Sequence, residues 1–164
     1  MKLFTIMWSN YLPMVKTAAE LLQCSLISFS TKQLNMSPAL IDEAKTKINM
    51  ADCILLYRTN DTFWDEIEAE VKVIRQRIPV VVIGSDPSFW GLSTVAPEIA
   101  AKAYRYMLDN GQANITNMLR FLVHHLFDRT VRFEEPQEMP WQGIYHPAHE
   151  AVFTDAESYR AWYA

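Results

Sequence analysis

The sequence predicts an α/β fold, with a four-stranded parallel sheet flanked by helices. Four short apolar runs recur along the first half of the chain, and such continuous runs are typical of parallel strands that are buried on both faces. Segments with a 3.6-residue period separate the runs, and this alternation of strand and helix implies right-handed βαβ crossovers. The chain has 164 residues, of which 50% are hydrophobic and 21% charged. This composition is that of a globular domain.

One strand is expected at each apolar run. The four runs are Leu3–Trp8, Leu26–Ser30, Cys53–Tyr57 and Val80–Ile83. We expect the strand order 2-1-3-4, as in a flavodoxin-like sheet. Because no fifth apolar run follows, we expect one edge of the sheet to lie uncovered.

Three helices are expected between these strands. The first carries its apolar residues between Val15 and Leu22 at helical spacing. The second begins at Ser37-Pro38, because a serine N-cap followed by proline is a typical helix start. The third has an apolar stripe from Phe63 to Ile74 and leaves its charged residues outside.

The pattern changes after the fourth strand. Residues 84–94 form a loop, and two helices follow at about 96–109 and 113–127, with Asn110-Gly111 ending the first and the glycine supplying a left-handed cap. Beyond them lies an extended, proline-spaced connector. Thr154-Asp-Ala-Glu157 has the form of a capping box and predicts a last helix. We therefore predict three parts: an α/β domain (1–94), a helical pair packed on it (95–128), and a connector with a truncated helix leading to a next domain (129–164).

Charge and cysteine content restrict the function classes. The formal net charge is −4 and the basic residues are scattered, so we expect no nucleic-acid partner. No window approaches the ~18 apolar residues of a transmembrane helix, so we expect no membrane partner. Cys24 and Cys53 stand alone without a CxxC pair, which indicates a reduced, cytoplasmic setting.

The common cofactor and phosphorylation motifs of such sheets are missing. Phosphate-binding loops need glycines, and Ser9-Asn10-Tyr11-Leu12-Pro13 after the first strand has none. A receiver domain requires an aspartate at the end of the third strand, where this chain has Arg58. We therefore expect neither a dinucleotide or flavin cofactor nor phosphorylation of this type.

A crevice at the carboxyl ends of the strands is the general ligand site of open α/β sheets. Arg58 offers a guanidinium that binds carboxylates in a bidentate manner. The alternative is a solvated loop in which Arg58 pairs with Asp61 or Asp86. The crevice candidates are Ser9, Asn10, Arg58, Asn60, Asp61, Ser85 and Asp86.

Histidines in the connector raise the question of a metal. His146-Pro-Ala-His149-Glu150 offers three donors within five residues. Structural zinc sites usually need four converging ligands, so we interpret these residues as part of a polar connector and predict no metal site. We also assign no catalytic residue.

Two segments resemble a known family. Residues 106–122, Tyr-Met-Leu-Asp-Asn-Gly-Gln-Ala-Asn-Ile-Thr-Asn-Met-Leu-Arg-Phe-Leu, and the later Gly143-Ile-Tyr-His-Pro147 are similar to the N-terminal region of cobaltochelatase large subunits. The large subunit of magnesium chelatase is a related possibility. Where the family has a glycine pair this chain has Asn110-Gly111, and Ala113 stands where the family has a glutamate, so no acid role is assigned there.

The resemblance implies a function. Such large subunits insert a divalent metal, here cobalt, into a corrin-type tetrapyrrole during cobalamin biosynthesis, as ATP-dependent ligases. ATP with Mg²⁺ is used on separate AAA+ partner subunits, so the fragment would bind no cofactor and be inactive alone. Its partners would be downstream domains of the same chain, the AAA+ subunits and the tetrapyrrole. The residues that carry the family motif, or an interface, are Gly111, Asn114, Asn117, Trp141, Gly143, Tyr145, His146 and Pro147.

A rival prediction about the function remains open. In it, the chain is a self-contained α/β module that binds an anionic small molecule or tetrapyrrole in the crevice, or else it is a pure interaction domain. In the latter, Trp141 and Tyr145 would lie against another chain.

Overall fold

A four-stranded parallel sheet forms the middle layer of the protein. The computed structural model describes residues 1–138 and 142–164. The strands are β1 (Lys2–Met7), β2 (Ser25–Ser30), β3 (Cys53–Tyr57) and β4 (Val80–Ile83), in the order β2-β1-β3-β4. All three pairings are parallel. The predicted fold class and strand order are confirmed.

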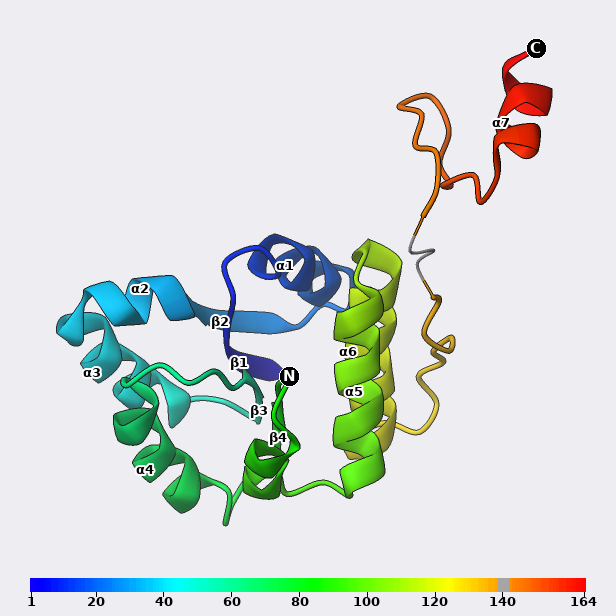
Figure 1. Cartoon of the computed structure of the whole chain (residues 1–164). Coiled ribbons are helices and arrows are strands. Elements are labelled where there is room, and N and C mark those ends of the chain that lie inside the picture. Colours follow the sequence, from blue (N-terminus) through cyan, green and yellow to red (C-terminus); the bar gives the residue numbers. More distant parts are fainter. Residues whose placement is uncertain (139–141) are drawn as a thin grey trace.

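Helices cover both faces of this sheet (Figure 1). One face carries α1 (Leu12–Leu21), α5 (Pro97–Asp109) and α6 (Gln112–Leu126), and the other carries α2 (Thr31–Met36), α3 (Pro38–Ile48) and α4 (Trp64–Ile74). Side chains of successive strand residues enter opposite cores: Leu55 packs with the first set of helices, while Ile54 and Leu56 pack with the second. This period of two explains why the central strand β3, which is covered on both faces, is buried at every position.

Helix α2 was not predicted from the sequence, although the sequence contains its signal. Ser30 accepts a hydrogen bond from the backbone N–H of Gln33 at 3.1 Å, and the Gln33 side chain accepts one from the Ser30 N–H. This reciprocal capping box starts a helix directly at the end of β2. At α3, Ser37 is the N-cap and Pro38 the first helical residue, as predicted, although the Ser37 side chain makes no capping hydrogen bond.

The turn between α5 and α6 differs in one detail from the prediction. Asn110 and Gly111 both have positive φ angles, 55° and 82°. The residue that ends α5 is therefore Asn110, whose ψ angle of −169° places it outside the left-handed helical region. Gly111 serves as the N-cap of α6.

The outer edge of β4 is covered, contrary to the prediction of an open sheet edge. A 3-10 helix at Pro87–Leu92 returns the chain to this edge. The Ser93 hydroxyl accepts from the Val82 N–H at 2.8 Å and donates to the Val82 carbonyl at 3.2 Å, and Thr94 bonds Val80 in the same way. Two hydroxyl side chains thus take the place of a fifth strand.

Replacing Ser93 tests this edge. Ser93→Ala leaves the buried Val82 N–H and carbonyl without these partners, and each unsatisfied buried group costs about 1–3 kcal/mol. We expect the free energy of unfolding, measured by urea denaturation, to fall by about 2 kcal/mol. Ser85→Ala changes an exposed residue and is expected to have no measurable effect. Equal stability of both variants would contradict the role of Ser93.

Residues 142–164 form a small unit with its own contacts. Ile144 and Phe153 pair as an antiparallel bridge with hydrogen bonds of 2.9 and 3.0 Å. Helix α7 (Ala156–Tyr163) follows, and its N-cap is Asp155, which accepts from the Ser158 N–H at 2.8 Å. The predicted helix is present, but its cap lies one residue after Thr154. In the described parts of the chain no helix has the length and apolarity needed to cross a membrane.

Candidate functional site

Two buried asparagines on α6 hold the connector against the helical pair. The Asn114 side chain donates to the Gln137 carbonyl at 2.8 Å and accepts from the Gln137 N–H at 2.9 Å. One turn later, Asn117 accepts from the Glu134 N–H at 3.2 Å. The carboxamide of Asn114 therefore pairs with an extended backbone as a neighbouring β-strand would.

Helix α5 adds further contacts to the same segment. The Tyr106 hydroxyl donates to the Glu134 carbonyl. Burial, together with the nearby Glu135 carboxylate, raises the pKa of Tyr106 to about 12, so this hydroxyl remains a donor across the physiological range. Lys102 pairs with Glu135 at 2.6 Å, and Arg105 pairs with Glu138. We call these contacts of α5 and α6 with residues 134–138 the connector clamp.

The chemistry of the connector clamp is that of a positioning device. Its buried partners are side-chain amides, a protonated phenol and backbone groups, none of which is a nucleophile or general base near neutral pH. The ion pairs lie on its exposed rim and contribute little each. The arrangement fixes the path on which the chain leaves the helical pair.

The other predicted motif residues lie in the unit 142–164, apart from Gly111 at the α5–α6 turn. A Cβ atom at Gly143 would meet the Val152 side chain and would lie 2.8 Å from the Phe153 carbonyl, so a larger residue would push the bridge apart. Tyr145 is 70% exposed, and Pro147 is also exposed. Trp141 lies outside the described residues.

The connector histidines surround an aromatic side chain. The ring of His146 lies 4.9 Å from that of Trp162, and His149 lies 5.1 Å from the same ring and 4.2 Å from Phe153. Nδ1 of His149 also contacts the Ala151 carbonyl at 2.8 Å. Within residues 1–138 and 142–164, no three His, Cys, Asp or Glu side chains are grouped so that they could share a metal ion.

The structure places Arg58 inside the protein rather than on an open crevice. Its guanidinium lies between the rings of Trp64 and Phe89, at 5.1 and 4.5 Å from their centroids. Its ion-pair partner is Glu68 at 3.7 Å, not Asp61 or Asp86, so the partners expected for a solvated loop are wrong. Desolvation lowers the pKa of Arg58, although Glu68 opposes this effect.

The two predicted aspartates organise loops. Asp61 accepts from the Asn35 side chain at 2.8 Å and from the Thr59 hydroxyl at 2.5 Å. Asp86 caps the 3-10 helix through the Ser88 N–H at 2.9 Å, and hydrogen bonding with the Ser88 side chain and then with this N–H lowers the pKa of Asp86. The remaining candidates are exposed: Ser9, Asn10, Asn60 and Ser85. Ligand binding by these residues stays a prediction.

An aromatic cluster at the same edge was not foreseen. Trp8, which is 44% exposed, lies 5.0 Å from Tyr57, and Tyr57 lies 6.3 Å from Tyr104. Burial raises the pKa of Tyr57 to about 12. Because these rings come from the residue after β1, from β3 and from α5, no local sequence pattern brings them together.

Comparison with known proteins adds the following findings. Residues 104–164 match the family model described as CobN/Magnesium Chelatase. The chain is 31% identical to a magnesium-chelatase subunit from Chlorobaculum parvum, over 43% of this chain and 6% of that protein. It is 38% identical to an uncharacterized protein of Methanocaldococcus jannaschii, over 32% of this chain and 4% of that protein.

A solved structure shares the fold. The catalytic subunit of cobaltochelatase from Mycobacterium tuberculosis superposes with a TM-score of 0.65, at 16% sequence identity, over 89% of this chain and 12% of that one. This likeness supports the α/β fold described above. The chain thus spans 4% to 12% of the length of these three proteins.

Proposed function

We propose that this chain, whose residues 104–164 match the model of the CobN/magnesium chelatase family, is a non-catalytic domain of a metal-inserting large subunit. In this proposal the domain holds the connector in a fixed path toward the part of the enzyme that performs the insertion. The observation that carries the proposal is the connector clamp. Its residues Tyr106, Asn114 and Asn117 all fall within the segment that matches the family model.

The finer function is proposed from the same resemblance. The complete enzyme would insert a divalent metal, cobalt in our proposal, into a corrin-type tetrapyrrole of cobalamin biosynthesis in the cytoplasm. Cobalt is a substrate of that reaction, and ATP with Mg²⁺ would be used on separate AAA+ subunits. Since no described residues form a metal-binding group, we assign no step of the insertion to this chain.

The first test is an activity measurement. Residues 1–164, mixed with Co²⁺, a corrin-type tetrapyrrole, ATP, Mg²⁺ and the AAA+ subunits of a cobaltochelatase, are expected to show no insertion above the rate without the chain. The change in the visible absorption of the macrocycle reports insertion. A complete cobaltochelatase serves as the positive control. Insertion that depends on residues 1–164 alone would refute the non-catalytic assignment.

A second test addresses the connector clamp. Asn114→Ala removes both hydrogen bonds to Gln137, so residues 134–138 are expected to leave the helical pair more often. A pair of hydrogen bonds of about 1 kcal/mol each corresponds to a roughly thirtyfold faster exchange of the Gln137 amide. Hydrogen–deuterium exchange followed by mass spectrometry or NMR measures this rate.

Asn49→Ala is the matched control for the clamp. The Asn49 side chain is exposed and bonds the Lys45 carbonyl within α3, remote from the connector, so exchange at Gln137 is expected to stay unchanged. Unaltered exchange in Asn114→Ala as well would remove the observation on which the proposed function rests.

The rival function, binding of an anion by the crevice, has less support. The Arg58 guanidinium, its predicted anchor, is 10% exposed and already contacts Trp64, Phe89 and Glu68. A ligand would have to reach a guanidinium that these side chains largely cover.

A further inference from the structure

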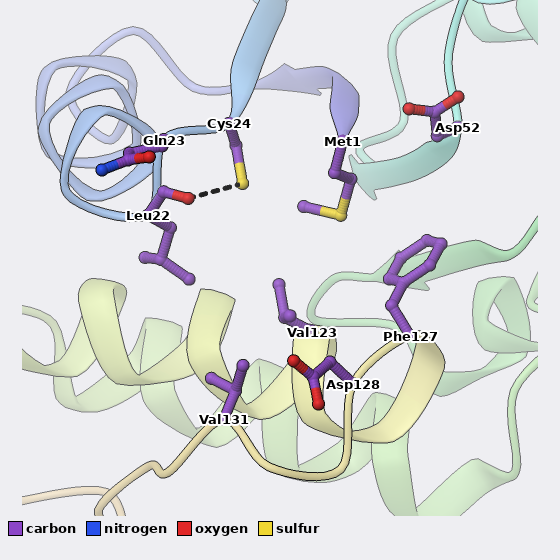
Figure 2. A pocket seen from close by; sticks show the side chains of 9 residues that line it. All are labelled: Met1, Leu22, Gln23, Cys24, Asp52, Val123, Phe127, Asp128 and Val131. Carbon is purple, nitrogen blue, oxygen red and sulfur yellow. Dashed lines mark hydrogen bonds between the residues drawn. The ribbon is translucent and has the colours of Figure 1, made fainter.

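A pocket of about 610 Å³ opens at the amino ends of the strands, at the opposite edge of the sheet from the crevice considered above. Met1, Cys24 and Asp52 line it immediately before β1, β2 and β3, and the end of α6 forms the facing wall (Figure 2). Val123 and Phe127 supply the apolar part of that wall.

The interior of this pocket, which we call the amino-end pocket, is apolar. Figure 2 shows the side chains of Met1, Cys24 and Val123 directed into one shared space. A void of about 10 Å³ behind Met1, Val123 and Phe127 continues toward Cys53. Pockets of about 300–1,000 Å³ with apolar walls and few polar groups are typical of small-molecule sites.

The charged side chains of the pocket favour a positively charged ligand. Asp52 accepts the Lys2 backbone N–H at 2.7 Å, and Asp128 accepts the N–H and hydroxyl of Thr130 at 2.9 and 2.7 Å. These bonds from Thr130 lower the pKa of Asp128, so this carboxylate is ionised at neutral pH. Of the described residues, no lysine, arginine or histidine lines the pocket.

Two basic groups act on residues of the pocket: the Met1 ammonium on Cys24 and the His124 imidazole on Asp128. The Met1 ammonium lowers the pKa of the Cys24 thiol, but desolvation of this thiol has the larger effect and raises it overall. Among the lining residues themselves, two carboxylates and one ammonium leave a net negative charge around an apolar interior.

We propose that the amino-end pocket binds a small molecule with an apolar body and a protonated amine. The apolar body packs against Leu22, Val123 and Phe127, and the amine lies beside Asp128 on the α6 wall, while Asp52 adds negative charge on the sheet side. Such a ligand contacts two parts of the protein. One is the segment after α6, with Asp128 and Val131, and the other is the amino edge of the sheet, with Met1 and Cys24. This inference stands independently of the proposed function.

Three probes of one skeleton test the charge preference: 4-phenylbutylamine, 4-phenylbutanol and 4-phenylbutyrate. Titration of residues 1–164 by isothermal calorimetry or NMR is expected to give saturable binding of the amine. Since a partly exposed charge pair contributes up to about 1 kcal/mol, the amine should bind about threefold to fivefold more tightly than the alcohol. The carboxylate should bind weakest.

Matched variants locate the binding. Val123→Trp fills the pocket and is expected to lose binding, while Val73→Trp on the exposed face of α4 is expected to keep it. Asp128→Asn is expected to retain binding of the alcohol and to abolish the preference for the amine. Circular dichroism verifies that each variant is folded, and Asp128→Asn remains decisive if Val123→Trp does not fold.

Thiol labelling gives an independent readout. Burial raises the pKa of Cys53 to about 12, so an aromatic disulfide reagent at pH 8 should react with Cys24 first. Bound 4-phenylbutylamine should slow this reaction, and Cys24→Ser should remove the fast phase. The proposal is overturned if the amine does not bind saturably, if the carboxylate binds most tightly, or if binding persists unchanged in folded Val123→Trp.

Discussion

Gly84→Ala is expected to lower the free energy of unfolding by about 3 kcal/mol or more. Gly84 ends β4 with a φ angle of +155°, and a Cβ atom there would lie 2.5 Å from the Arg58 carbonyl oxygen. Backbone strain of this kind costs about 1–3 kcal/mol, and an overpacked contact costs about 1–3 kcal/mol more. The neighbouring backbone cannot easily move away, since the Arg58 N–H donates to the Ile83 carbonyl at 2.7 Å.

Gly91→Ala is the matched control. A Cβ atom at Gly91 meets nothing within 4 Å, and its φ angle is outside the left-handed region. We therefore expect a change within about 1 kcal/mol. Urea denaturation monitored by circular dichroism measures both variants under the same conditions. If Gly84→Ala and Gly91→Ala prove equally stable, the close approach of β4 to Arg58 is not a constraint on this fold.

Trp64→Ala is expected to have a similarly large effect. Trp64 is 1% exposed, lies in the core on the α4 face of the sheet, and donates its indole N–H to the Thr59 hydroxyl at 2.8 Å. Removing a buried tryptophan costs about 3–5 kcal/mol. For a chain of this length each kcal/mol corresponds to about 2–4 °C, so the Tm should fall by about 10 °C.

Two further variants separate the contributions of Trp64. Trp64→Phe keeps most of the packing but loses the hydrogen bond to Thr59, so an intermediate Tm is expected. Trp8→Ala changes a tryptophan that is 44% exposed and should lower the Tm by much less. Differential scanning calorimetry compares the three, and a Tm for Trp64→Ala as high as that for Trp8→Ala would contradict the structure.

The site could be predicted only in part. Asn114 and Asn117 were selected because they belong to the family-like segment, yet their partners Gln137 and Glu134 are 23 and 17 residues away. No local pattern indicates that a carboxamide pairs with a distant backbone. Arg58 was correctly placed at the end of β3, but its burial between Trp64 and Phe89 depends on the position of the 3-10 helix.

Local physical rules account for the features that could be predicted from the sequence alone, namely the strands and the parallel sheet. Apolar runs determined the strands, and the alternation of strand and helix determined a parallel sheet, while the confirmed order β2-β1-β3-β4 was expected from the flavodoxin-like pattern. These features depend on side-chain period and on the chirality of the crossover, both of which are present in a short stretch of sequence.

Packing between distant segments determined the rest. The cover over the edge of β4, the connector clamp and the amino-end pocket each join residues from elements that are far apart in the chain. Their hydrogen bonds and cavities exist only once the layers have come together, because a buried polar group takes whichever partner the tertiary structure brings within reach.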